Sequence, residues 1–169
     1  MKIIFLDIDG VLNSVQSVEM ARRVESGRKG GIDVQDQCFC PIAISNLNCA
    51  VEDVSNLWIV ISSTWRKLHT LPEIRQMLSM AGFLYPWRIF SSTPIKMSSW
   101  HRGSEILWWL QENAQKYEVN SFAILDDADD MEPHMEHLVL TDHRHGFMYK
   151  DLEKLIDGFK SGKFKYKVA

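Results

Sequence analysis

A short apolar run at residues 3–6 ends in two carboxylates that lie two residues apart, Asp7 and Asp9. The run is typical of a buried strand, and Gly10 allows the backbone to leave that strand sharply. Burying two like charges at the end of a strand is costly, and a divalent cation or a shared proton would offset this cost. The chain is therefore expected to fold around a sheet that carries a charged site at the end of its first strand.

The segment Asp-Ile-Asp-Gly-Val at residues 7–11 resembles the first signature of the haloacid dehalogenase (HAD) superfamily, most of whose members are Mg²⁺-dependent phosphatases. The resemblance implies that Asp7 attacks phosphorus to form an aspartyl-phosphate, while Asp9 protonates the leaving group and later activates water. A carboxylate is an accepted nucleophile for phosphoryl transfer, and a second one with a tuned pKa serves as acid and base. Mg²⁺ would reduce the repulsion between Asp7 and the incoming phosphate. A solvated acidic turn is the alternative to a catalytic site here.

The second element that the resemblance implies is a hydroxyl at the end of a second strand. An apolar run at residues 57–61 leads directly into Ser62 and Ser63. Either hydroxyl, together with the backbone N–H groups of the turn, can donate to a phosphate oxygen, and Ser62 is the expected donor. Arg66 lies close enough to reach a second phosphate or a nucleic-acid backbone. The alternative is that the hydroxyls only cap the next helix.

The third element is a cation at the start of a helix, which is normally Lys in the superfamily. The segment Arg-Gly-x-Glu-Ile-x-x-Trp-Leu at residues 102–110 is similar to a subgroup found in RNA-repair proteins. Arg102 then takes the role of the Lys and holds the nucleophile and the bound phosphate, although Arg is a wide fork and Lys a point charge. Lys96, on a loop expected a few residues upstream, is the alternative cation.

The fourth element is a group of acids after a third long apolar run, which ends in Asp126-Asp127-Ala-Asp-Asp130. The resemblance implies that Asp126 binds Mg²⁺ together with Asp7 and the main-chain carbonyl of Asp9, since Mg²⁺ prefers hard oxygen ligands. Asp127 and Asp130 are then expected to orient water or a basic residue around the metal ligands. A solvated acidic loop is the alternative, but its position directly after a buried strand disfavours it.

Strand-like runs alternate with helical segments along the chain, which predicts a single α/β domain over residues 1–169. The expected fold is Rossmann-like and has three layers, with helices on both faces of a parallel sheet of about five strands. Ligands bind at the carboxyl ends of the strands in such a sheet, and the candidate residues fall there. Strands are predicted at residues 2–7, 57–62, 88–91, 122–126 and 138–141, and helices at about 41–54, 71–81, 103–117 and 150–159.

Two segments lie outside this pattern. Residues 14–40 contain several Arg and Gly residues and are expected to form a flap or minimal cap, with a solvated loop as the alternative. A nearly uncapped site favours large substrates such as nucleic-acid ends, and the basic residues would attract phosphate at range. Residues 160–169 form a basic tail, which we interpret as a frayed end, with an edge strand guarded by lysines or a nucleic-acid-binding arm as alternatives.

Together these residues predict a Mg²⁺-dependent phosphatase that hydrolyses phosphomonoesters, with phosphorylated RNA or DNA ends, in particular a 3′-phosphate, as the expected substrate. A phosphatase of mononucleotides or other small phosphoesters is one alternative, and an inactive nucleic-acid or protein binding module is another. A kinase or ligase that completes a repair reaction would be a separate protein. The net charge of −3 argues against an obligate polyanion binder. The three cysteines, and the lack of a membrane-length apolar stretch or signal peptide, favour a cytoplasmic protein.

Overall fold

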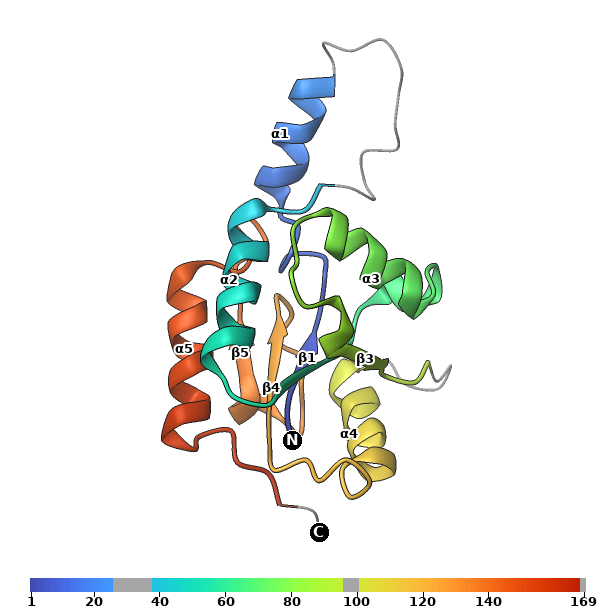
Figure 1. Ribbon diagram of the computed structural model, residues 1–169, viewed down its shortest axis with the longest axis vertical. Coiled ribbons are helices and arrows are strands. Elements are labelled where there is room, and N and C mark those ends of the chain that lie inside the picture. The colour runs from blue at the N-terminus through green and yellow to red at the C-terminus, as the bar shows by residue number, and fades with distance from the viewer. Residues whose placement is uncertain (26–37, 96–100, 168–169) are drawn as a thin grey trace.

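The computed structural model describes residues 1–25, 38–95 and 101–167, and its centre is a parallel sheet of five strands (Figure 1). The order of the strands is β3-β2-β1-β4-β5, so the first strand lies in the middle of the sheet. Every predicted strand forms, and each bound lies within one residue of its predicted position. The strands are β1 (Lys2–Leu6), β2 (Leu57–Ile61), β3 (Ile89–Ser92), β4 (Ser121–Asp126) and β5 (Leu138–Leu140).

Helices cover both faces of the sheet, which confirms the predicted α/β architecture. Three of them, α2 (Pro41–Asp53), α3 (Leu71–Met80) and α5 (Tyr149–Ser161), share a hydrophobic core with Ile4 and Leu6 of β1. Helix α4 (Arg102–Asn113) packs on the opposite face, where Ile3 and Phe5 lie. Strand β1 contributes to both cores because successive side chains of a strand point to opposite faces. No helix in the described ranges has the length and apolar character needed to span a bilayer.

Helix α1 (Val15–Glu25) is a helix that the sequence analysis did not predict. It begins at the carboxyl edge of the sheet and projects beyond the body of the molecule (Figure 1). Two serines stabilise its first turn, since the Ser14 backbone N–H donates to Ser17 Oγ (2.8 Å) and the Ser17 N–H donates to Ser14 Oγ (3.2 Å). The first part of the expected flap is therefore helical, and residues 26–37 of it lie outside the described residues.

The C-terminal segment is docked against the start of β4. Lys165 pairs with Ser121 in an antiparallel bridge, and the Phe122 N–H donates to the Phe164 carbonyl (3.0 Å). The Phe164 side chain is buried between α5 and the sheet, with 1% of the residue exposed. The interpretation of this segment as a frayed end is therefore wrong as far as Tyr166, whose N–H is also hydrogen-bonded. The geometry favours the edge-strand alternative.

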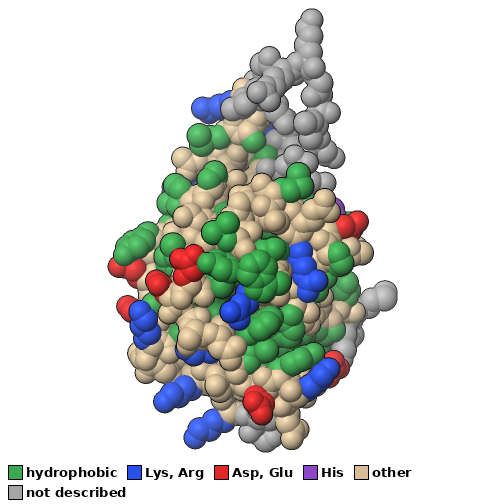
Figure 2. All heavy atoms as spheres, in the orientation of Figure 1, with side chains coloured by type: hydrophobic (Ala, Val, Ile, Leu, Met, Phe, Trp, Pro, Cys, Tyr) green, Lys and Arg blue, Asp and Glu red, His purple; other side chains and the backbone are tan. Residues whose placement is uncertain are grey.

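This docked segment lies at the amino edge of the sheet, whereas the candidate site lies at the carboxyl edge. Ser121 begins β4 and Asp126 ends it, which separates the two edges by roughly 17 Å at about 3.3 Å per residue. Figure 2 shows that Lys and Arg side chains are scattered over this face, with several near the lower end, where α5 and the C-terminal segment lie. On the face shown they form no continuous basic strip, so the position of the tail does not support a nucleic-acid-binding arm at the site.

Replacing Phe164 by Ala is expected to destabilise the fold by about 3–5 kcal/mol, as large-to-small changes at buried aromatic positions do. The ring packs against Phe159, with 5.3 Å between ring centroids, and fills the space beside Gly158. The free energy of unfolding in urea measures the effect. Lys160→Ala, an exposed position in the same region, is the control and should change it by less than about 0.5 kcal/mol. Equal effects of the two changes would contradict the docking of this segment.

Candidate active site

The carboxyl ends of β1, β2 and β4 bring the predicted strand-end residues together. Leu6, the last residue of β1, is in register with Ile61 at the end of β2 and with Leu125, one residue before the end of β4. The pairing continues by one residue, because the Asp7 N–H donates to the Leu125 carbonyl (3.0 Å) and the Ser62 N–H donates to the Leu6 carbonyl (2.8 Å). Asp7, Ser62 and Asp126 therefore leave three neighbouring strands at one level of the sheet.

Three carboxylates gather at this level. Asp7, Asp126 and Asp127 each offer one oxygen, and the three oxygens lie within 4.8 Å of one another. Burial, and after it the negative charge of Asp7, raise the pKa of Asp126 to about 7, and the same two causes raise the pKa of Asp127. A group of hard carboxylate oxygens that repel one another suits Mg²⁺, which prefers oxygen ligands. The donor set therefore fits the metal that the sequence implies.

Asp127 is held in this group by its contact with the turn that follows β1. Gly10 has a φ of +72°, and a Cβ added there would lie 2.3 Å from Asp127 Oδ2. Only glycine meets both conditions, since other residues rarely adopt this φ and any side chain would displace the carboxylate. The sequence analysis expected Asp127 only to orient groups around the metal ligands. The structure places its carboxylate close enough to Asp7 and Asp126 to bind the metal directly.

Arg102, the first residue of α4, lies between the two buried carboxylates. Its Nη1 contacts Asp7 Oδ2 and lies 2.5 Å from Asp126 Oδ2. Burial lowers the pKa of Arg102, but the charges of Asp7 and Asp126 outweigh burial and raise it above its usual value. The geometry thus matches the part of the expected role in which this cation holds the nucleophile. Lys96, the alternative cation, lies outside the described residues.

The residue after Arg102 allows α4 to begin at this point. A Cβ at Gly103 would lie 2.2 Å from the Glu132 carbonyl oxygen and 2.6 Å from the Met131 carbonyl carbon. The first turn of α4 can therefore approach the loop after β4 only with glycine at this position. This close approach keeps Arg102 beside the carboxylates.

The two serines after β2 have different surroundings. Ser63 Oγ accepts a hydrogen bond from the Trp65 N–H (3.4 Å) and so caps the short 3₁₀ helix Thr64–Lys67, as the capping alternative predicts. Ser62 is fully buried, and its Oγ has no hydrogen-bond partner among the described residues. A buried hydroxyl without a partner is uncommon and calls for an explanation such as an absent ligand. Ser62 is thus the hydroxyl that remains available to a phosphate oxygen.

Arg66 is largely buried and bound to partners inside the protein, although it also lines the pocket on the α4 side of the site. Its guanidinium contacts the Glu105 carboxylate and donates to the carbonyls of Ser63 (2.5 Å) and Thr93 (3.1 Å). Only 5% of the Arg66 side chain is exposed. The sequence analysis expected this residue to reach a second phosphate, whereas the structure makes it a clamp between the Ser62–Ser63 turn and α4. Glu105 was not a predicted site residue, although it stands in the segment that carries the family resemblance.

Asp9 is exposed and is held by two side chains that the sequence analysis did not select. Its Oδ1 accepts a hydrogen bond from Asn13 Nδ2 (2.8 Å), and its Oδ2 accepts one from the Trp65 indole N–H (3.0 Å). Asn13 lies two residues after the first signature, and Trp65 stands between Ser63 and Arg66 in sequence. The carboxylate expected to act as acid and base is therefore fixed in direction while it remains open to solvent.

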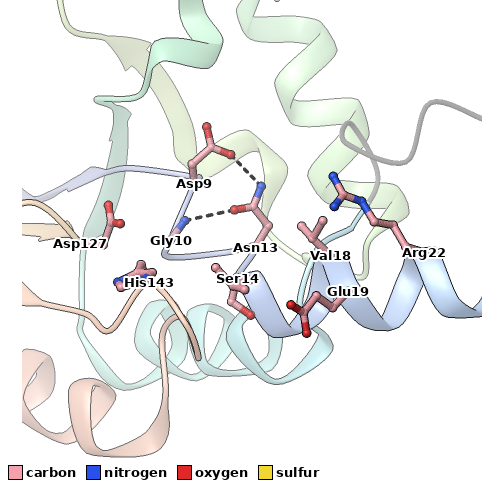
Figure 3. Close-up of a pocket in the computed structure, with 10 residues that line it drawn as sticks. Asp9, Gly10, Asn13, Ser14, Val18, Glu19, Arg22, Asp127 and His143 are labelled. Carbon is pink, nitrogen blue, oxygen red and sulfur yellow. Dashed lines mark hydrogen bonds between the residues drawn. The ribbon is translucent and has the colours of Figure 1, made fainter.

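Two pockets flank the site. One, of about 330 Å³, lies between Asp9, Asp127 and the side of α1 (Figure 3). The other, of about 240 Å³, lies on the α4 side and is lined by Arg102, Lys67 and Asp130 among others. Asp130 Oδ2 is 4.0 Å from the His101 ring, so this acid faces the α4 pocket and is not part of the three-carboxylate group.

Comparison with known proteins identifies one family. A family model described as the HAD domain in Swiss Army Knife RNA repair proteins matches residues 3–152. No curated protein and no solved structure matches significantly. The matched range runs from β1 into α5 and contains every candidate residue discussed above.

Removing the carboxylate of Glu105 is expected to destabilise the protein by about 3 kcal/mol or more, because it leaves the buried Arg66 guanidinium without its charged partner. Urea unfolding of Glu105→Ala measures this loss. Glu112→Ala, at an exposed position of the same helix, is the matched control and should have little effect. If both changes cost the same, Arg66 does not depend on Glu105 and the clamp is refuted.

In metal-free protein, the raised pKa of Asp126 predicts that this residue favours folding less as the pH rises. The folded protein keeps a proton on Asp126 up to about pH 7, whereas the unfolded chain loses it near pH 4. We therefore expect the stability of the wild type relative to Asp126→Asn to fall between about pH 4 and pH 7 and then to level off. Urea unfolding in the presence of EDTA tests this, and a constant difference across the range would contradict it.

Proposed function

Because the chain belongs to the family of HAD domains found in Swiss Army Knife RNA repair proteins, we propose that it is a Mg²⁺-dependent phosphatase of phosphorylated nucleic-acid ends, in particular of a 3′-phosphate. One observation carries the proposal. The nucleophile candidate Asp7, its counter-ion Arg102 and the unpartnered hydroxyl of Ser62 meet at one edge of the sheet, with Asp9 two residues beyond Asp7.

In the first step, a carboxylate oxygen of Asp7 attacks phosphorus and the bond from phosphorus to the alcohol oxygen breaks. Asp9 gives its proton to that oxygen as it leaves, so the products are a free alcohol and an aspartyl-phosphate on Asp7. In the second step, Asp9 takes a proton from water, which attacks phosphorus. Inorganic phosphate leaves and the Asp7 carboxylate is restored. The hydrogen bonds from Asn13 and Trp65 keep the Asp9 carboxylate in a fixed direction during both transfers.

Holding the phosphoryl group is most of the catalytic task, because charge spreads over its oxygens in the transition state. The Ser62 hydroxyl donates to one of these oxygens, and the guanidinium of Arg102 faces the others while it remains against Asp7. Arg66 acts through this turn, since its bond to the Ser63 carbonyl and its ion pair with Glu105 fix the position of Ser62.

Mg²⁺ would be held by the carboxylates of Asp7 and Asp126, with Asp127 and the main-chain carbonyl of Asp9 as further oxygen donors. Bound there, it supplies positive charge that offsets the repulsion between these carboxylates and a phosphate dianion. Asp130 faces the pocket beside Arg102 and would contribute only at longer range.

A phosphatase of mononucleotides or other small phosphoesters is the second candidate. The pocket beside Asp9, at about 330 Å³, lies at the small end of the range of ligand sites, about 300–1,000 Å³, and has room for one nucleotide unit. A binding module without turnover is the third, but both Asp7 and Asp9, whose loss would mark it, are present.

Phosphate release in the presence of Mg²⁺ tests the proposal, with a 3′-phosphorylated oligonucleotide, a 5′-phosphorylated one and a mononucleotide as substrates. We expect the 3′ end to be the best substrate and Asp7→Asn to lower release by at least about 10³-fold, because the nucleophile is lost. Asp129→Asn, an exposed acid near the site, is the matched control and should retain activity. Preference for the mononucleotide would favour the second candidate, and no Asp7-dependent release from any phosphoester would favour the third.

A further inference from the structure

The pocket beside Asp9 lies on the side of the site from which the leaving group departs. Asp9 forms one wall, and four residues of α1 form the facing wall (Figure 3), namely Val15, Val18, Glu19 and Arg22. Because the acid must reach the oxygen that leaves, the group attached to that oxygen occupies the space next to Asp9. The pocket is therefore the place for the alcohol half of the substrate, while the phosphoryl half lies against Asp7.

The α1 wall of this pocket is fixed to the body of the protein. The Val15 N–H donates to the His143 carbonyl (3.1 Å), and the Gln16 N–H donates to the Arg144 carbonyl (3.2 Å). These carbonyls satisfy N–H groups of the first turn that have no partner within the helix. Thr141 lies in the same loop, and its hydroxyl donates to the Gly10 carbonyl (3.0 Å). The loop is therefore bound both to α1 and to the turn that carries Asp9. The pocket is thus formed before any substrate arrives.

The charges of the lining favour an uncharged ligand that donates hydrogen bonds. Three carboxylates, those of Asp9, Glu19 and Asp127, face one guanidinium, that of Arg22, and the ring of His143. When Asp9 carries its proton and Asp127 faces the metal, Glu19 and Arg22 remain and balance each other, so the lining offers no net positive charge to a second phosphate. A hydroxyl group, in contrast, can donate to a carboxylate, which is an acceptor only. A sugar, with several hydroxyls and an apolar ring face that can lie against Val18, matches this lining.

We propose that this pocket binds the ribose of the terminal nucleotide and that Glu19 accepts a hydrogen bond from its 2′-hydroxyl. The carboxylate of Glu19 is exposed and forms no ion pair with any residue in the described ranges, so it is available to a ligand. The 2′-hydroxyl is the group by which a protein distinguishes RNA from DNA. The inference rests on the proposed function and deepens it, because it names the pocket and the side chain that would select a ribose at the phosphorylated end.

Two oligoribonucleotides that differ by one atom test the inference. Both carry a 3′-phosphate, and one has a terminal ribose while the other has a terminal 2′-deoxyribose. We expect the ratio of their kcat/KM values to be about tenfold in favour of ribose for the wild type, as the loss of a hydrogen bond to a charged group predicts. The ratio should fall to about one in Glu19→Ala, and Glu153→Gln, an exposed acid on α5, should keep the wild-type ratio.

The outcomes separate this inference from the function on which it rests. Equal hydrolysis of both oligonucleotides by the wild type would overturn ribose recognition and leave the phosphatase in place. A ribose preference that persists in Glu19→Ala would overturn the role of Glu19. The absence of Asp7-dependent release from either oligonucleotide, with release from a mononucleotide or an aryl phosphate, would overturn the proposed substrate and this inference together.

Discussion

The repulsion between two buried carboxylates on neighbouring strands is the constraint on which the site depends. Asp7 directly follows β1 and Asp126 is the last residue of β4, and the register of these strands places the two acids side by side. Parallel strands lie about 4.8 Å apart, so the two acids cannot separate without breaking the sheet that carries both hydrophobic cores. Burial and, after it, the like charge of Asp7 favour a protonated carboxyl, which is why the pKa of Asp126 rises to about 7 even with Arg102 beside it. The same register that builds the core thus creates a demand for positive charge.

The first turn of α4 supplies this positive charge and also holds the other residues of the site in position. Arg102 supplies the charge, Gly103 allows the close approach, and Glu105 binds Arg66 beneath the serine turn. Further along the same helix, Trp109 packs edge-on against Phe5 of β1, with 5.4 Å between ring centroids. The helix is therefore part of the core and part of the site, and a shift of its axis would disturb the phosphate-binding turn and the carboxylates together.

The sequence was sufficient to predict the sheet, the covering helices and the strand-end residues, because an apolar run that ends in Asp or Ser marks both burial and the edge of the sheet. It did not reveal partners that are distant in the chain. Trp65 binds Asp9 across 56 positions and Glu105 binds Arg66 across 39, and no local pattern selects either pair. Arg66 was interpreted as a phosphate ligand because the local sequence does not show whether an arginine near such a turn is exposed or buried. Helix α1 was missed, although Ser14 and Ser17 have the spacing of a helix start.

The two ends of the described chain meet at the edge of the sheet opposite the site (Figure 1). The Met1 carbonyl accepts a hydrogen bond from the Asn120 N–H (3.0 Å), and the Tyr166 N–H donates to the Asn120 carbonyl (2.9 Å), so one residue before β4 ties both ends down. A tether attached at either end would extend from the side of the molecule that faces away from Asp9. The protein can therefore be immobilised on a surface or joined to a second domain through either end while the approach to its catalytic carboxylates stays open.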